Sequence, residues 1–491
     1  VEAFDPTIWS EFARRRAPVT IYRAGHFTPA LRLLERMGLG EAFLARNIRS
    51  QLEMWRIART EVALPAPRPG ARPPAARPAR ILLPVHNTIQ FDNAGYAIRG
   101  HGLLSALAAA RPDFDLNVIG RPGYPWDRKD AEVIRRRPLS ETIDGVRYDC
   151  FPESVYEDLH GLTQRDRLDA YGDLLSARAE RDGAALLHAC ANYFNGYAAA
   201  IAAQRTGAAY VYEVRGLWEV TRRSREPAWA GTEQHDAMVA MEATVARKAD
   251  RVICITEPLA EIMTARGVDP TRIVVVPNGV DTRAFQPASP GAPDALREIG
   301  VDRRGRLVVG FIGSVVAYEG LDLLVEAVAR LPHEVRERLL VVIIGDGAHF
   351  DPVQRLVQQH GLSDTIAMPG RVPFEAVRGF YAAFDMCVYP RCGIEVCEVV
   401  SPLKPFEAMA MAKPILVSSA RAVSDFVRDG ETGFVFEKDD PDALARALTQ
   451  AVAAPSALPA AGAAAREWVE RERDWRQIAE TVAGVYDALL G

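Results

Sequence analysis

The stretch EVCEVVSPLKPFEAMAMAKPILVSS, residues 395–419, decides the fold of this chain and reads as a loop, a helix and a strand. Ser401 can cap the free N–H groups at a helix start, and Pro402 suits the first helical position. Pro414 is expected to end the helix after Lys413, and the apolar run that follows is typical of a buried strand. The stretch therefore predicts a helix that leads into a strand of an α/β sheet.

A cation and a carboxylate lie near the start of this predicted helix. Lys404 is one turn inside it, and a helix N-terminus with a lysine beside it is a ready site for phosphate. Glu407 lies one turn further on, where its carboxylate could accept hydrogen bonds from a sugar diol. The plainer alternative is an amphipathic helix with a Lys404–Glu407 surface pair. These residues alone do not decide between the two interpretations.

The length and composition indicate a globular protein of more than one domain. A single core rarely organises 491 residues, so we expect at least two domains. The longest apolar run, which starts at Leu339, is too short to span a membrane. Six cysteines in this length do not form a disulfide framework, which favours the cytoplasm. Cys387, Cys392 and Cys397 lack a suitably spaced fourth ligand, so we expect no metal.

The first 79 residues differ from the rest in charge. Residues 1–80 contain fourteen Arg and no Lys, against seven Asp or Glu, although the whole chain carries a net charge of −5. Residues 1–61 show apolar positions at helical spacing, and residues 65–80 contain only Pro, Ala, Arg and Gly. We expect a basic helical extension and linker over 1–79 that contacts the inner membrane face or a protein partner. A solvated helical arm explains the charge equally well.

Short apolar runs alternate with helical segments in two series after this extension. Such alternation predicts parallel sheets covered by helices on both faces, and the restart of the pattern predicts two Rossmann-like, doubly wound α/β domains. The expected strands of the first series are ILLPV, LNVIG, ALLHAC, AAYVYEV, RVICI and RIVVVP, and those of the second are RLVVGFIG, LLVVIIGDG, TIAMPG, DMCVYP, PILVSS and GFVF.

Ligands of open parallel sheets bind beyond the carboxyl ends of the strands, so the loops that follow the strands are the places to search. Neither series contains G-x-G-x-x-G, which disfavours a dinucleotide oxidoreductase, and no G-x-x-x-x-G-K-S/T motif for P-loop phosphate binding occurs. In the second series the loops contain Gly313 and Ser314, Gly345 and Asp346, Arg371 and Val372, and residues 391–401.

Several segments occur in a characteristic order: GYAIRGHGLLSAL (95–107), LLHACANYFNGYAAA (186–200), YEVRGLWE (212–219), CITEPLAEIMTARGVDPTRIVVVPNGVD (254–281), and then GFIGSVVAYEGLDLL, VVIIGDG, GRVPFEAV and SPLKPFEAMAMAKPILVSS. In this order they resemble the retaining, nucleotide-sugar-dependent glycosyltransferases of family 4, the group 1 glycosyl transferases. The resemblance covers about residues 80–490. It implies the GT-B fold, in which an acceptor-side domain (80–284, with a returning helix at 474–490) and a nucleotide-sugar-binding domain (285–473) face a cleft.

The resemblance also implies roles for individual residues. Glu407 matches the second glutamate of the family's E-x7-E motif, which binds the ribose, and Gly313 matches the glycine beside the diphosphate. Arg371 and Val372 lie where the family holds the base. The other donor-binding candidates are Ser314, Gly345, Asp346, Glu395, Ser401 and Leu403, and the acceptor-side candidates are Gly95, Tyr96, His101 and Asn192.

The sequence departs from the family at positions that bear on catalysis. Ser314 and Glu319 stand where the family has an arginine and a lysine, so we expect Lys404 and Arg391 to supply the missing positive charge. Glu398 lies nine residues before Glu407, one more than the motif requires. The family's H-x-H reads His188-Ala189-Cys190, and Asn192 or His101 could replace the absent histidine. The catalytic candidates are Lys404, Arg391, Glu398 and His188.

These features predict a retaining transferase that moves a hexose-type sugar from a nucleoside-diphosphate sugar, with uridine as the expected base. The acceptor would be a glycan, a lipid-linked molecule or a protein, and we expect no nucleic-acid partner. The leaving diphosphate can itself take the acceptor's proton, so the protein would act by charge stabilisation and positioning, without metal or other cofactor. Two alternatives are a non-catalytic sugar-nucleotide-binding or scaffold protein on the same fold and a nucleotide-sugar epimerase.

Overall fold

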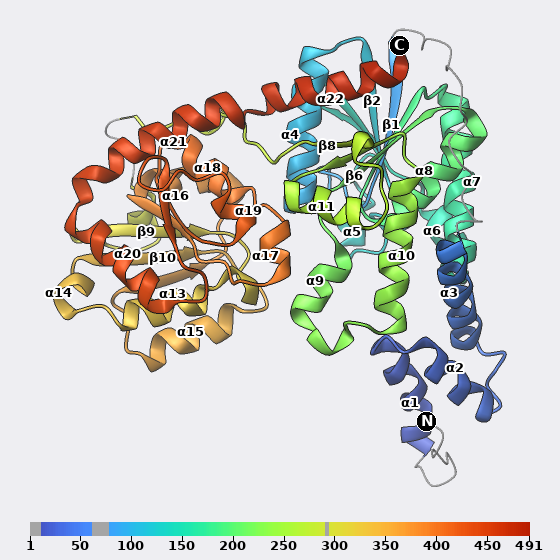
Figure 1. The fold of residues 1–491 in the computed structure, drawn as a ribbon, viewed down its shortest axis with the longest axis horizontal. Coiled ribbons are helices and arrows are strands. Elements are labelled where there is room, and N and C mark those ends of the chain that lie inside the picture. Colours follow the sequence, from blue (N-terminus) through green and yellow to red (C-terminus); the bar gives the residue numbers. More distant parts are fainter. Residues whose placement is uncertain (1–10, 61–77, 290–293) are drawn as a thin grey trace. The chain divides into compact units, whose positions relative to one another are not determined.

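The computed structural model describes residues 11–60, 78–289 and 294–491 (Figure 1). The predicted Pro/Ala/Arg linker lies almost wholly outside these ranges. The chain divides into two compact units: the first contains the described residues up to Val276 together with Ala479–Gly491, and the second is Pro277–Ile478. The described helices of the basic extension belong to the first unit.

The first unit is built on an eight-stranded sheet with the order β3-β4-β2-β1-β5-β6-β7-β8. All neighbouring strands are parallel except β3 and β4, which form a hairpin. The central strands β5 and β6 are buried along their whole length, as expected of apolar runs in a sheet covered on both faces. The strands are β1 (Ala79–Val85), β2 (Phe114–Gly120), β3 (Ser140–Ile143), β4 (Val146–Asp149), β5 (Leu186–Cys190), β6 (Ala209–Val214), β7 (Arg251–Cys254) and β8 (Ile273–Val275).

The β3–β4 hairpin is an addition to the predicted strands. Its turn residues Asp144 and Gly145 have φ angles of 48° and 80°, and a two-residue hairpin turn of this kind favours Asp-Gly. The apolar pattern misses the hairpin because β3 is largely polar and exposed. The Asp-Gly pair is the signal that could have located it.

Helices cover the sheet of the first unit. Near the end of the chain α22 lies beside α4 and β2 (Figure 1), where Arg111 forms an ion pair with Asp487 at 2.6 Å. The helices are α4 (Gly95–Ala110), α5 (Ala131–Ile134), α6 (Glu153–His160), α7 (Gln164–Asp182), α8 (Tyr193–Thr206), α9 (Trp218–Arg225), α10 (Glu233–Arg247), α11 (Glu257–Ala265) and α22 (Trp475–Leu490).

Three helices of the basic extension, α1 (Glu11–Arg23), α2 (Phe27–Arg36) and α3 (Phe43–Thr60), complete the first unit. Phe27 and Ile48 belong to a small buried cluster against which Ala237 of α10 packs. Helix α3 also contacts α7 and α10. These helices are therefore packed against the unit, and the alternative of a solvated arm does not apply to their described residues.

The second unit has a six-stranded, fully parallel sheet with the order β11-β10-β9-β12-β13-β14. This is the doubly wound arrangement, with its topological switch point between β9 and β12. Its strands are β9 (Leu307–Ile312), β10 (Leu339–Ile344), β11 (Ile366–Gly370), β12 (Met386–Tyr389), β13 (Ile415–Ser418) and β14 (Gly433–Phe436). Every predicted strand is thus observed, and two doubly wound α/β domains are confirmed.

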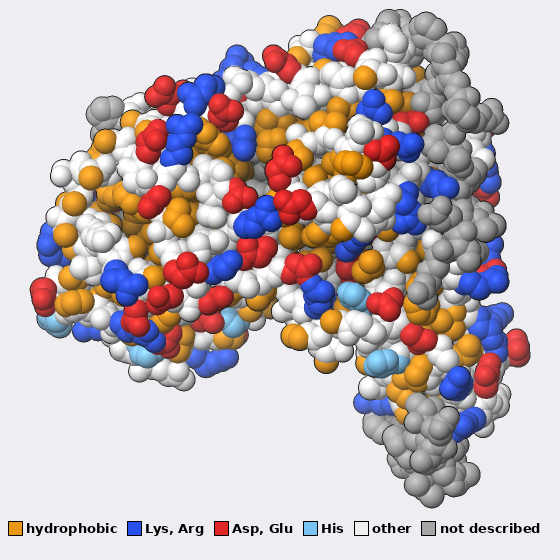
Figure 2. All heavy atoms as spheres, in the orientation of Figure 1, with side chains coloured by type: hydrophobic (Ala, Val, Ile, Leu, Met, Phe, Trp, Pro, Cys, Tyr) orange, Lys and Arg blue, Asp and Glu red, His pale blue; other side chains and the backbone are white. Residues whose placement is uncertain are grey.

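The helices of the second unit are α12 (Ala295–Glu298), α13 (Leu321–Ala329), α14 (His333–Arg336), α15 (Phe350–Gln359), α16 (Val377–Ala383), α17 (Glu395–Val399), α18 (Lys404–Ala410), α19 (Arg421–Ser424), α20 (Pro441–Ala453) and α21 (Leu458–Glu472). Figure 2 shows charges of both signs interspersed over the visible face of this unit. Across the ranges that the structure describes, no helix is both long enough and apolar enough to cross a membrane.

Candidate functional site

A short helix, α17, occupies the start of the stretch that was predicted to be a loop, and the predicted helix begins later than expected. It is α18, and no side-chain cap satisfies its N-terminus. The Ser401 carbonyl instead accepts a hydrogen bond from Asn278 Nδ2 at 2.6 Å, and Pro402 disfavours helical backbone at the residue before it. The predicted cap at Ser401 is therefore wrong, and Lys404 is the first residue of the helix.

Lys404 and Glu407 form an ion pair at this helix start. Lys404 Nζ lies 3.0 Å from Glu407 Oε2 and 3.2 Å from Oε1. The glutamate side chain is 5% exposed and that of the lysine 26%, so this is a half-buried pair and not the surface pair of the plainer interpretation. Tyr381 donates from its hydroxyl to Glu407 Oε2 at 3.1 Å. Two donors therefore orient the carboxylate, and further lone pairs are left to accept from a ligand.

A second ion pair joins the two strands at the switch point. Arg391 follows β12, Glu319 follows β9, and Arg391 Nε lies 3.4 Å from Glu319 Oε1. Arg391 is 3% exposed and also donates to the Val400 carbonyl at 2.7 Å. Burial raises the pKa of Glu319, and Arg391 works against that rise by favouring the carboxylate. The arginine predicted to neutralise phosphate is thus buried and paired, so the geometry supports a role in holding the two loops together instead.

Glycines allow the loops after β9, β10 and β11 to touch. Gly313 N donates to the Ile344 carbonyl at 3.0 Å, and Gly345 N donates to the Gly370 carbonyl at 2.9 Å. Gly345 has a φ of 135°, and a Cβ atom there would lie 1.8 Å from the Gly313 oxygen. Only glycine fits this position.

The other residues predicted for the second unit lie after its strands, in loops and in the short helix α17. Glu398 is engaged there: its Oε1 lies 2.8 Å from Lys438 Nζ, and its Oε2 accepts from Arg421 N at 2.9 Å. This argues for a role in joining loops and leaves its predicted catalytic role without geometric support. Among the remaining candidates, the exposed ones are Ser314, Asp346 and Arg371, and the half-buried ones are Val372, Glu395 and Leu403.

His188 lies in the core of the first unit. It is 1% exposed on β5, and its Nδ1 lies 2.6 Å from the Tyr486 hydroxyl. Beside it, the buried Glu213 contacts Arg99 at 2.7 Å and Arg215 at 2.6 Å. Burial opposes ionisation of Glu213, but the two arginines outweigh it and hold its pKa well below the usual value. The predicted catalytic role of His188 is therefore corrected to a structural one, because a substrate has no access to its ring.

Three side chains of this cluster have the spacing of metal ligands. Candidate ligand atoms of His188, Cys190 and Glu213 lie within 4.8 Å of one another. The carboxylate, however, is already neutralised by two guanidinium groups, and burial raises the pKa of the Cys190 thiol to about 12. A protonated thiol and a neutralised carboxylate are poor ligands, so the cluster fits a structural role.

The predicted acceptor-side residues separate in the structure. Asn192, at the carboxyl end of β5, caps α8 by accepting from Phe194 N at 3.2 Å. His101 lies one and a half turns into α4 and contacts the Tyr148 hydroxyl at 2.9 Å and Asp144 at 3.0 Å. It joins α4 to the hairpin, so it does not supply the histidine that the family motif lacks. Gly95 and Tyr96 are exposed at the start of α4.

A cavity that the sequence analysis missed lies at the carboxyl edge of the first sheet. It has a volume of about 450 Å³, and His86 after β1, Arg121 after β2, Phe194 after β5 and Trp218 after β6 are among its lining residues. We call it the polar cavity. Two buried atoms in its lining, His86 Nδ1 and Arg121 Nε, have no hydrogen-bond partner in the described part of the chain. His86 and Arg121 each directly follow a strand, and this position could have located the cavity from the sequence.

The charge state of the polar cavity suits a polar or anionic ligand. Burial, followed by the charge of Arg121, lowers the pKa of His86 to about 3, so its ring is neutral at physiological pH. A neutral imidazole and a guanidinium can together hold hydroxyl and phosphate oxygens. Asp127 accepts from Arg121 at 2.6 Å and fixes its position.

Comparisons with known proteins cover both units. The family model described as "Glycosyl transferase 4-like domain" matches residues 94–279, and the model "Glycosyl transferases group 1" matches residues 294–468. The D-inositol 3-phosphate glycosyltransferase of Streptomyces scabiei is 29% identical over 418 residues, which are 83% of this chain and 89% of that protein. Residues 11–60 lie outside both family models.

Two solved structures share the architecture. Sucrose-phosphate synthase from Thermosynechococcus elongatus superposes with a TM-score of 0.66 at 22% identity, over 84% of this chain and 99% of that one. HepE from Anabaena, solved in complex with UDP and glucose, superposes with a TM-score of 0.63 at 15% identity, over 84% of this chain and all of that one. At these identities the likeness concerns the fold.

Proposed function

The chain belongs to the group 1 glycosyl transferases and has the GT-B fold, and we propose that it is a retaining enzyme that transfers a hexose-type sugar from a UDP-sugar. The observation that carries the proposal is the half-buried Lys404–Glu407 pair beside the switch point of the second unit. Since the chain is a glycosyltransferase, the alternatives of an epimerase and of a non-catalytic scaffold are set aside.

The choice of uridine is supported by the fold neighbour HepE, whose structure contains UDP and glucose. In the proposed complex the ribose hydroxyls donate to Glu407, whose carboxylate is held in place by Tyr381. Glu395, at the start of α17, would accept from hydroxyls of the donor sugar. Arg371 and Val372, which directly follow β11, would flank the base.

The chemical step breaks the bond between the anomeric carbon and the diphosphate oxygen and forms a bond from the acceptor hydroxyl on the same face of the sugar. The leaving diphosphate takes the proton of that hydroxyl, so no side chain needs to act as a base. Lys404 is proposed to turn from Glu407 towards the developing negative charge, while ribose hydroxyls replace it at the carboxylate. The Arg391–Glu319 pair fixes the loops on either side. On this account the reaction requires no metal.

For the acceptor we propose a hydroxyl compound with an anionic group. The polar cavity, with the guanidinium of Arg121 and the neutral ring of His86, supports this choice. The relative from Streptomyces scabiei, whose name specifies an inositol phosphate, is in line with it.

A hydrolysis and transfer screen tests the proposed function. Purified protein is incubated with UDP-, GDP- and ADP-hexoses, with and without EDTA, and release of the nucleoside diphosphate is measured. We expect release from a UDP-hexose that EDTA does not change, and loss of release in Lys404→Ala but not in the control Lys129→Ala, an exposed lysine of the first unit. Release from a GDP- or ADP-sugar alone would overturn the choice of base, and normal release by Lys404→Ala would remove Lys404 from the mechanism.

A further inference from the structure

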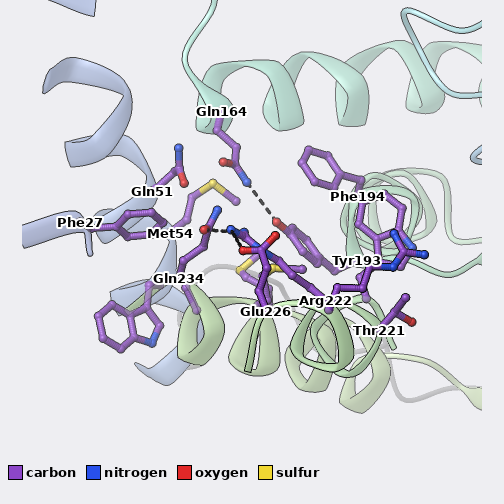
Figure 3. Close-up of a pocket in the computed structure, with 16 residues that line it drawn as sticks. Phe27, Gln51, Met54, Gln164, Tyr193, Phe194, Thr221, Arg222, Glu226 and Gln234 are labelled. Atoms are coloured by element: carbon purple, nitrogen blue, oxygen red, sulfur yellow. Dashed lines mark hydrogen bonds and ion pairs between the residues drawn. The ribbon is translucent and has the colours of Figure 1, made fainter. Parts of the chain in front are cut away.

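Helices α2 and α3 enclose a second cavity together with other helices of the first unit (Figure 3). It has a volume of about 610 Å³, which is within the usual range for small-molecule sites. Phe27 of α2 and Met54 of α3 line one side, and Phe194 of α8 lies on the opposite side, with Arg222 of α9 between them. The cavity therefore depends on helices that lie outside both family models.

The walls of this cavity suit a hydrocarbon chain. Eight of the sixteen lining residues are aromatic or methionine, among them Trp55, Trp218 and Met241, and most of the others are glutamines or charged residues. Methionine side chains adapt to flexible apolar ligands, and aromatic rings offer large apolar surfaces. We call this space the apolar cavity.

The apolar cavity adjoins the polar cavity. Phe194 and Trp218 line both. His86, in the polar cavity, contacts Trp218 edge to face with ring centroids 5.0 Å apart. A ligand with a polar end near His86 and Arg121 could therefore pass these two aromatic rings and place an apolar chain against α2 and α3.

The charges beside the apolar cavity favour an anion. Arg222 is engaged, since it donates to Gln234 at 2.8 Å and pairs with Glu226 at 3.0 Å. Arg225 also lines the cavity, is exposed, and forms no ion pair within the described residues. One arginine charge is thus uncompensated here, whereas Arg121 in the polar cavity is paired with Asp127.

We propose that the apolar cavity holds the hydrocarbon chain of a single-chain anionic amphiphile whose polar end occupies the polar cavity. This inference rests on the proposed function, and under that function the acceptor is an anionic lipid-linked molecule. The packed helices of the basic extension then form part of the acceptor site. They supply one wall for the chain, a function that neither doubly wound domain provides by itself.

Binding of a fluorescent C18 carboxylate, cis-parinaric acid, to the full chain tests the proposal. We expect saturable binding, competed by dodecyl phosphate and at least about tenfold less well by dodecanol. Met238→Trp, which fills the apolar cavity from α10, should weaken binding at least about tenfold. Arg225→Gln should weaken it about three- to fivefold, while Arg223→Gln, two residues away and outside the lining, should not.

Thermal unfolding of each variant, together with hydrogen exchange in the sheet of the first unit, establishes that this unit is folded. The proposal is overturned if wild-type protein binds the probe without saturation, if a folded Met238→Trp variant binds it normally, or if dodecanol competes as well as dodecyl phosphate. Binding to anionic vesicles that Met238→Trp leaves unchanged, with no uptake of the free probe, would point to a surface contact and also overturn it. Because probe binding needs no donor, failure of sugar transfer in the screen above and failure of this proposal are separate results.

Discussion

At the scale of single residues, several buried charged groups among the described residues are paired inside their own unit. Lys404 is the case with the clearest consequence, because its ammonium group both satisfies a buried carboxylate and is proposed to stabilise the leaving diphosphate. Lys404→Met should lower single-turnover transfer by about 100-fold. It should also destabilise the second unit by roughly 1–3 kcal/mol, because Glu407 loses a partner.

The double variant Lys404→Met/Glu407→Gln separates these two effects. Without the buried charge it should regain most of the stability in urea unfolding, but it should not regain transfer. If transfer returns together with stability, neither the Lys404 ammonium group nor the Glu407 carboxylate is needed for transfer.

Glu213 provides a second test at this scale, through stability alone. Glu213→Gln leaves two buried guanidinium groups without their counter-ion and should destabilise the first unit by about 3–5 kcal/mol at pH 7. The folded pKa of Glu213 lies below its unfolded value, so its contribution is present above the unfolded pKa and is lost as the pH falls through the folded pKa. Urea unfolding should show that the loss of unfolding free energy in Glu213→Gln becomes smaller at strongly acid pH. The exposed control Glu180→Gln should stay within about 0.5 kcal/mol of wild type.

At the scale of elements, the contact between the loops after β9 and β10 depends on a missing side chain. Gly345→Ala would place a Cβ atom 1.8 Å from the Gly313 oxygen, so the loops must separate. We expect a loss of more than about 3 kcal/mol in unfolding free energy and loss of UDP binding by calorimetry. The matched control is Gly361→Ala, where φ is also positive at 65° but no atom lies within 4 Å; it should cost about 1 kcal/mol and leave UDP binding unchanged. Equal effects in the two variants would refute the contact as the cause.

A pH-dependent contact joins α10, α8 and β6. Glu242 on α10 accepts from Tyr193 N at 3.0 Å and from the Tyr212 hydroxyl. Burial, and then the nearby Glu219, raise the pKa of Glu242 to about 8. Because this folded pKa exceeds the unfolded one, the stabilisation is complete below the unfolded value near 4.5 and is lost as the pH rises through 8.

The free energy of unfolding should therefore fall between pH 5 and pH 8 by up to about 1.4 kcal/mol per pH unit from this group. Urea unfolding over that range measures the slope. Glu242→Gln should flatten it, and Glu180→Gln should not. A slope that Glu242→Gln leaves unchanged would mean that another group titrates.

At the scale of the whole molecule, each unit has its own sheet and its own core, so a ligand of one need not stabilise the other. UDP at about 100 times its dissociation constant should stabilise the second unit by about 2.7 kcal/mol. Hydrogen exchange should show the new protection in the loops after β9, β10 and β12. Protection of equal size throughout the sheet of the first unit would contradict the assignment of donor binding to the second.

The helix of the opening stretch shows where prediction from local sequence ends. Residues 395–419 contain the predicted helix and strand, and Pro405 falls within the first turn as predicted, but α17 occupies the predicted loop. Helix α18, however, starts after the predicted cap, because Asn278, which is far away in the chain, donates a hydrogen bond to the Ser401 carbonyl. It ends at Ala410 rather than Lys413, and Ala412 has a φ of 53°, which an α-helix does not accommodate. Long-range hydrogen bonds and local backbone geometry both override the sequence signals.

The sequence by itself determined the α/β class, the strands of both sheets apart from the hairpin, and the family. Apolar runs and strand–helix alternation are local properties, so they can be read along the chain. Only the tertiary structure decided which polar groups are paired: Arg391 with Glu319, Lys404 with Glu407, and His188 with a tyrosine 298 residues away. It alone also placed α2 and α3 against the first unit and enclosed the apolar cavity. These contacts join segments whose separation along the chain carries no information about their distance in space.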